Sequence, residues 1–145
     1  MNIRSIEPPD IDAILAIQSA CPQIAQWTIG DYDRVVGGEM VGWVAVEGGQ
    51  VSGFLVARRV VSDLEILNFA VRAGARRQGV GTSLFREVLK WGRVMQAETA
   101  ILEVRSSNFA ALHFYERHDF RVSSRRPRYY TGPVEDALLL TAVLG

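Results

Sequence analysis

The sequence has one cysteine, two histidines and no long apolar run among its 145 residues. A single cysteine, Cys21, cannot form an intrachain disulfide, which fits a reducing compartment. His113 and His118 are too few to hold a metal, and their spacing of five places them on different faces of a helix. We therefore expect neither a disulfide framework nor a metal site.

Excess charge and membrane-directed segments are also absent. The 16 basic and 16 acidic residues cancel, so overall charge gives no reason to expect direct binding of nucleic acid or of a membrane surface. Residues 1–7 lack the apolar core of a signal peptide, and no segment reaches the roughly 18 apolar residues of a membrane span. These features predict a soluble, cytoplasmic protein, and its length predicts one domain over residues 1–145.

The pattern of apolar residues predicts an α/β fold. Pro8-Pro9-Asp10 opens a helix with apolar residues near period 3.6, Pro22 closes it, and Thr28 is the expected N-cap of a second helix through Val36. A strand–helix–strand crossover over residues 63–105 predicts that its two strands run parallel. The other expected elements are strands at 3–6, 43–47, 51–61, 63–71, 99–105, 120–123 and 134–143, and helices at 80–90 and 108–117.

A glycine-rich segment lies between a predicted strand and the most clearly amphipathic helix; it is Arg76-Arg77-Gln78-Gly79-Val80-Gly81-Thr82. The first turn of a helix presents unpaired N–H groups and the positive end of the helix dipole, so this segment suits an anion such as a pyrophosphate. It contains neither the Gly-Lys-Ser/Thr of a P-loop nor a complete Gly-x-Gly-x-x-Gly motif. The alternative is that the glycines only make a tight turn between strand and helix.

Three polar residues form a second candidate constellation. Asn108 and Tyr115 are seven positions apart and share one face of a predicted helix. Glu103 lies in the preceding strand between two apolar residues, where an unpaired carboxylate is costly to bury. In the alternative interpretation, Glu103 pairs with Arg105 or another arginine at the sheet surface, and Tyr115 is a core aromatic.

Taken together, these motifs resemble the GNAT acetyltransferases. Arg76-x-x-Gly79-x-Gly81 after Leu67–Val71 is similar to the acetyl-CoA motif of that family, and Leu102–Phe120 resembles the RimI group, the N-α-acetyltransferases that modify ribosomal protein S18. The resemblance implies the GNAT fold: a single mixed, mostly antiparallel sheet, flanked by helices and splayed between two central parallel strands.

The resemblance also implies where the acetyl donor lies. The backbone of Phe69, Ala70 and Val71 would pair with the pantetheine arm of acetyl-CoA like an added strand, and an N–H there would polarise the thioester carbonyl. The Arg76–Thr82 segment would hold the pyrophosphate, and Asn108 would bind the cofactor farther along its arm.

Glu103 would then act as general base, directly or through water, and Tyr115 as general acid. An amine attacks a thioester only when neutral, and an α-amino group has a pKa of about 8 against about 10.4 for lysine. A carboxylate can remove that proton near neutral pH, while a phenol stays protonated and can donate to the departing thiolate.

The acceptor side is predicted from aromatic residues. Trp27, Tyr129 and Tyr130 are expected to shape a slot for a protein N-terminus, with ribosomal protein S18 as the partner. Arg128 departs from the RimI pattern and leaves the acceptor open. The first alternative is a GNAT enzyme that acts on lysine side chains or a small-molecule amine, and the second is a non-catalytic CoA-binding module.

Overall fold

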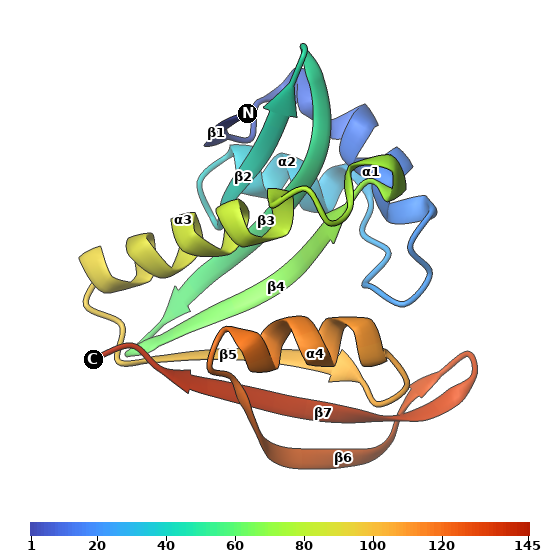
Figure 1. Ribbon diagram of the computed structural model, residues 1–145, viewed down its shortest axis with the longest axis vertical. Coiled ribbons are helices and arrows are strands. Elements are labelled where there is room, and N and C mark those ends of the chain that lie inside the picture. Colours follow the sequence, from blue (N-terminus) through green and yellow to red (C-terminus); the bar gives the residue numbers. More distant parts are fainter.

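The chain folds around a seven-stranded sheet with helices on both faces (Figure 1). The computed structural model describes residues 1–145. In spatial order the strands are β1 (Asn2–Ser5), β2 (Val41–Glu47), β3 (Gln50–Val60), β4 (Asp63–Val71), β5 (Thr99–Arg105), β7 (Val134–Val143) and β6 (Arg121–Thr131). Neighbouring strands are antiparallel except for β4 and β5, which are parallel. The predicted order of elements and the parallel pair are therefore confirmed.

The helices cover the two faces in pairs. Helices α1 (Ile11–Ser19) and α2 (Ile29–Val36) lie on one face, and α3 (Val80–Val94) and α4 (Phe109–Arg117) lie on the other. Short 3-10 turns at Pro8–Asp10 and Ala73–Ala75 precede α1 and follow β4. None of these helices combines the length and apolar character that a membrane crossing requires.

Each face of the sheet has its own apolar core. Ile14, Tyr32 and Phe54 are fully buried on the α1/α2 side, and Leu64 and Phe85 are fully buried on the α3/α4 side. The start of α2 is capped as predicted: the Thr28 hydroxyl accepts a hydrogen bond from the N–H of Asp31, and the Asp31 carboxylate accepts one from the N–H of Thr28.

The two central strands separate soon after they meet. Strands β4 and β5 pair only over Asp63–Glu65 and Thr99–Ile101, and in Figure 1 they diverge from that point, so that the sheet opens into two arms. A β-bulge follows at once on β4, because Asn68 pairs with Val56 whereas Ile66 pairs with Ala57, which leaves Leu67 unpaired. The predicted splay between the two parallel strands is therefore present.

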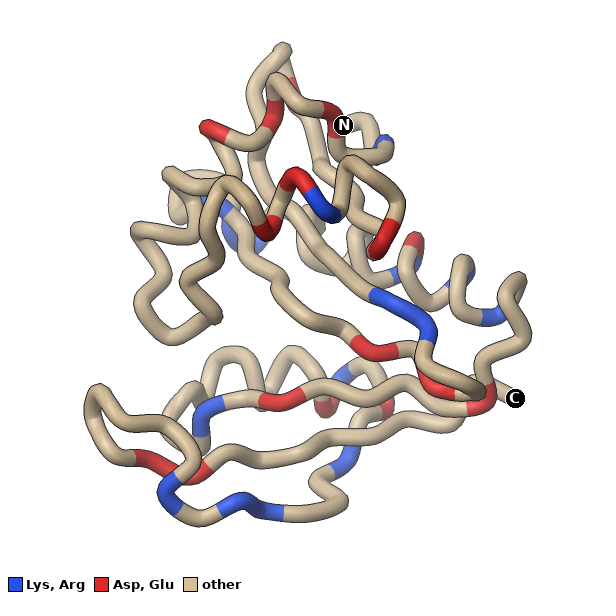
Figure 2. The backbone as a smooth tube through the Cα atoms, turned by 180° about the vertical axis from the view of Figure 1, so that it is seen from behind, with Lys and Arg blue, Asp and Glu red and all other residues tan.

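Strand β6 is longer than predicted. It runs over Arg121–Thr131 and not over 120–123, and nearly all of it is exposed. The expected extent was wrong because β6 is an edge strand, held to β7 by backbone pairing without an apolar face of its own. Its arginines and Pro127 are typical of a protected sheet edge, and in Figure 2 basic positions recur along this lowest strand.

Candidate active site

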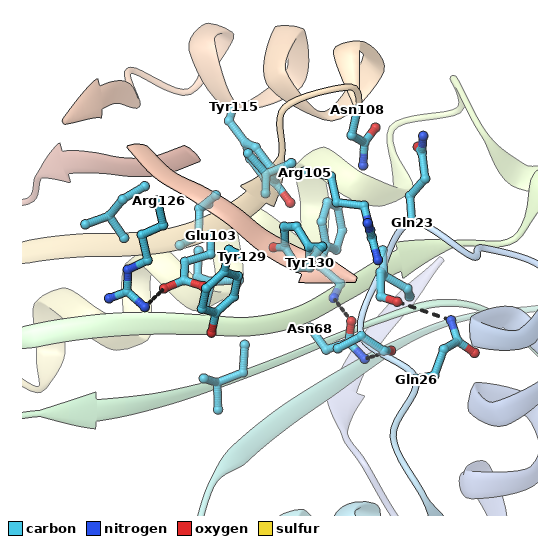
Figure 3. Close-up of a pocket in the computed structure, with 18 of the residues that line it drawn as sticks. Gln23, Gln26, Asn68, Glu103, Arg105, Asn108, Tyr115, Arg126, Tyr129 and Tyr130 are labelled. Atoms are coloured by element: carbon cyan, nitrogen blue, oxygen red, sulfur yellow. Dashed lines mark hydrogen bonds and ion pairs between the residues drawn. The ribbon is translucent and has the colours of Figure 1, made fainter. Parts of the chain in front are cut away.

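The divergence of β4 and β5 opens a cleft of about 850 Å³. Its walls are the facing parts of these two strands, the 22–26 segment after α1, and the hairpin of β6 and β7 (Figure 3). The lining brings together six of the residues singled out in the sequence: Phe69, Glu103, Asn108, Tyr115, Tyr129 and Tyr130.

Other predicted residues lie outside this lining. Ala70, Val71 and the Arg76–Thr82 segment lie farther along the chain toward α3. Trp27 packs its ring on Tyr32, with centroids 5.4 Å apart, and its carbonyl accepts a 2.7 Å hydrogen bond from Gln18. These contacts join Trp27 to α1 and α2, and its contact with an acceptor stays a prediction.

Glu103 lies in the middle of β5 and faces Arg126 of β6 (Figure 3). Its Oε1 is 3.2 Å from Nη1 of Arg126, and its side chain is 30% exposed. The alternative interpretation expected Glu103 to pair with Arg105 or another arginine. The pairing is present, and the partner is Arg126. Arg105 instead pairs with Glu135 at 3.2 Å and lies over the ring of Tyr130.

Tyr115 projects from α4 into the cleft (Figure 3). Its ring packs against Phe69, Phe85, Phe114 and Phe120, and only 8% of the residue is exposed. Burial raises the pKa of its phenol, so the hydroxyl stays protonated through the neutral range. Tyr115 is thus a core aromatic, as one interpretation expected, and it also lines the cleft, as the other expected.

A shift in strand register turns both tyrosines of β6 toward the cleft. Consecutive residues of a regular strand point to opposite faces, but the pairing of β6 with β7 shifts between Arg126 and Tyr130. Asp136 holds the shifted segment, since it accepts hydrogen bonds from the N–H of Arg128 at 3.0 Å and from the side chain of Arg125 at 2.6 Å. Tyr129 and Tyr130 therefore both line the cleft.

A buried polar network that sequence reasoning missed supports the β4 wall. Asn68, next to the bulge, donates from Nδ2 to the hydroxyl of Tyr32 at 3.2 Å and to the carbonyl of Ala25 at 3.1 Å. Its Oδ1 accepts a hydrogen bond from the N–H of Phe69 at 3.2 Å, so this N–H is held by its neighbour in the structure. No local pattern marks Asn68, because its partners lie far away in the sequence.

The Arg76–Thr82 segment has the features of an anion site. The backbone N–H groups of residues 77–82 donate to no other protein group, and they lie at the N-terminal end of the 15-residue helix α3. The Arg77 side chain is exposed beside them. Such an array of free N–H groups suits a pyrophosphate.

Glycine is required at two positions of this segment for different physical reasons. Gly79 adopts a left-handed conformation with φ of 82° at the N-cap of α3. A Cβ on Gly81 would lie 3.2 Å from Cζ of Phe69 and 3.3 Å from Cε2 of Phe114, so glycine lets the first turn of α3 pack closely on both rings. The alternative interpretation, that the glycines make a tight turn between strand and helix, is therefore partly correct. The same segment also presents the free N–H groups.

Comparison with known proteins identifies the class. The sequence model of the Acetyltransferase (GNAT) family matches residues 11–120, and the splayed sheet with its cleft is the arrangement that the motif resemblance implied. The chain belongs to the GNAT family and is an N-acetyltransferase.

Within this family the chain is similar to enzymes named for N-terminal acetylation. The ribosomal protein bS18-alanine N-acetyltransferase of Escherichia coli is 27% identical over 96% of this chain and 95% of its own length, and its crystal structure superposes with a TM-score of 0.88 over 99% of this chain and 94% of that one. An N-alpha-acetyltransferase of Sulfolobus acidocaldarius is 33% identical, covering 99% of this chain and 92% of its own length. The resemblance to the RimI group is thereby confirmed.

Proposed function

We propose that the protein transfers an acetyl group from acetyl-CoA to the N-terminal α-amine of a protein, with ribosomal protein S18 in the cytoplasm as the acceptor. The observation that carries the proposal is that one cleft joins Glu103 of β5 with Tyr115 of α4, beside the two tyrosines of β6. Relatives named for acetylation of protein N-termini match nearly the whole chain, which supports this choice of acceptor.

The residues present fit acetyl-CoA, the donor that acetyltransferases of this family use. The free N–H groups of residues 77–82 would hold its pyrophosphate. Beyond Glu65, β4 has no ladder partner on its β5 side, so the backbone at Phe69, Ala70 and Val71 would pair with the pantetheine arm, and the N–H of Phe69 would exchange its bond to Asn68 for one to the arm. Asn108 caps α4 through Oδ1, which leaves its Nδ2 to donate to the arm.

The proposed reaction is a direct transfer. The amine nitrogen forms a bond to the thioester carbonyl carbon, and the carbon–sulfur bond breaks. Glu103 takes a proton from the nitrogen, directly or through water, and Tyr115 gives its proton to the departing sulfur; solvent exchange then restores both groups. Each such proton transfer typically contributes about a hundredfold or more to the rate.

A peptide panel tests the acceptor. One peptide has a free α-amine and no lysine, its matched partner has a blocked N-terminus and an internal lysine, and a small primary amine completes the set. We expect acetylation of the first peptide to dominate in kcat/KM, because its amine loses its proton more readily. Preference for the lysine peptide or the small amine would replace the proposal with that acceptor, and no acetylation at all would favour a non-catalytic CoA-binding module.

The identity of the protein acceptor needs a second measurement. Intact ribosomal protein S18 should gain one acetyl group, a mass of about 42 Da, at its N-terminus in cells that contain this chain and not in cells that lack it. An S18 N-terminus that is the same in both cell types would exclude S18 as the acceptor while leaving the peptide result intact.

A further inference from the structure

Arg126 is the cation that contacts Glu103 in the cleft. Its guanidinium lies 3.2 Å from the carboxylate, and it reaches Glu103 across β7, the strand that separates β6 from β5. The same guanidinium lies 5.4 Å from the ring centroid of Tyr129. Two positions are therefore within its reach, one on a carboxylate and one on an aromatic face.

The other charged residues of the cleft are already paired elsewhere. Arg105 pairs with Glu135, and Glu65 pairs with Arg58 at 3.1 Å. Arg126 thus has Glu103 as its acidic partner, and Glu103 has Arg126 as its basic one. The remaining titratable side chains around the cleft are the phenols Tyr115, Tyr129 and Tyr130.

This ion pair conflicts with the approach of an acceptor amine. With a pKa of about 8, an α-amine arrives at neutral pH mostly as a cation. Two cations held against one carboxylate repel each other, so the incoming ammonium and the guanidinium compete for Glu103. Arg126 can leave Glu103 with a small loss of free energy, because its side chain is 54% exposed and the ring of Tyr129 lies beside it.

We propose that Arg126 is a resident counter-ion of Glu103 that the α-ammonium of the acceptor displaces. Arg126 then sets the affinity for the acceptor and takes no part in the chemical step. The inference rests on the proposed function, because it needs the acceptor amine to bind at Glu103. It makes Arg126 a residue that sets acceptor affinity and that a motif comparison does not mark.

The test compares two peptides that differ by one group. One is the acceptor peptide with its α-amine, and the other is the same peptide with that amine replaced by hydrogen. Both are bound to enzyme saturated with CoA, so that no transfer occurs. The proteins are wild type, Arg126→Gln, and Arg93→Gln as a control for the loss of one positive charge, since Arg93 is an exposed arginine of α3 that lies outside the cleft lining and makes no ion pair.

We expect Arg126→Gln to bind the amine peptide about two- to fivefold more tightly, the factor that corresponds to an ion pair of this exposure. Its affinity for the desamino peptide should not change, and Arg93→Gln should leave the ratio of the two affinities as in wild type. A loss of affinity for the amine peptide, or an equal change for both peptides, would overturn the proposal, because a peptide-backbone contact or a structural role would act on both.

Kinetics give a second readout. Arg126→Gln should lower KM for the acceptor by a similar factor and leave kcat unchanged within about twofold, and Arg126→Lys should restore the wild-type KM because it restores the competing cation. A fall in kcat with KM unchanged would place Arg126 in the chemical step and overturn the proposal. Failure of the proposed function is distinct from either result, since wild type would then acetylate none of the α-amine peptides.

Discussion

The carboxylate of Glu135 on β7 accepts a 2.7 Å hydrogen bond from the backbone N–H of Ser107 in the turn before α4. The same carboxylate pairs with Arg105 at the end of β5. One side chain thus ties the strand that carries Glu103 to the helix that carries Tyr115. This contact therefore helps to position the two proposed catalytic groups relative to each other.

Replacing Glu135 should therefore cost stability in a pH-dependent way. Hydrogen bonds from Ser107, together with the nearby Arg105, lower the pKa of Glu135 from its usual 4.5. A carboxyl with a lowered pKa stabilises the fold at pH values above its usual pKa, and that contribution is lost as the pH falls through the lowered pKa. Glu135→Gln should unfold at a lower temperature than wild type at neutral pH, and the difference should shrink in acid. Thermal melts in pH steps measure this, and a difference that persists in strong acid would contradict it.

Tyr115→Phe should impair turnover and leave stability intact. The hydroxyl points into the cleft and bonds to no other protein group, so its loss should change the free energy of unfolding by no more than about 0.5 kcal/mol. Loss of the general acid should lower kcat about a hundredfold.

The pH dependence of the wild-type rate gives a further check on Tyr115. Because burial raises the pKa of this phenol, its ionisation should cause no fall in rate up to about pH 10, the usual pKa of tyrosine. If the variant turned over acetyl-CoA and peptide as fast as wild type, Tyr115 would have no role as an acid.

Tyr32→Phe should lower the stability of the fold, in contrast to Tyr115→Phe. Tyr32 is fully buried, its hydroxyl donates to Oε1 of Gln18 at 2.6 Å, and it accepts from Asn68 at 3.2 Å. Removing it takes one hydrogen-bond partner from each of two buried amides, which should cost about 1–3 kcal/mol in total. Urea denaturation measures the loss, with Tyr115→Phe as the matched control. Equal stability of the two variants would show that the network contributes nothing.

The two glycines of the Arg76–Thr82 segment should respond differently to asparagine. Gly79 needs a left-handed conformation but has open space around it, so Gly79→Ala should cost about 1–2 kcal/mol and Gly79→Asn less, because asparagine tolerates that conformation. At Gly81 any side chain meets Phe69 and Phe114, so alanine should cost about 1–3 kcal/mol and asparagine more. Chemical denaturation of the four variants tests the pattern, and the same ranking at both positions would refute it.

Much of the fold was predictable because it depends on local patterns. Apolar periodicity marks α3, and the crossover rule makes β4 and β5 parallel. The length of β6 was predicted wrongly because an exposed edge strand has no buried face. Its Arg125-Arg126-Pro127-Arg128 segment lacks the alternation of apolar and polar residues that marks a strand.

Residues of the candidate site were predictable only where they belong to a recognisable sequence motif. Glu103, Asn108 and Tyr115 were marked by spacing and resemblance, and the structure places all three on one cleft. Asn68 and Arg126 carried no signal, because their partners lie on other elements and come together only through the bulge in β4 and the pairing of β6 with β7.

By itself the sequence determined which groups were available: a carboxylate, a phenol and a helix that begins with free N–H groups. These follow from residue type and local periodicity. Tertiary structure alone decided that Glu103 faces Arg126, that both Tyr129 and Tyr130 turn inward, and that the N–H of Phe69 is held by Asn68. The physical reason is that strand register and splay depend on packing between distant segments, and a shift of one residue moves a side chain to the opposite face of a sheet.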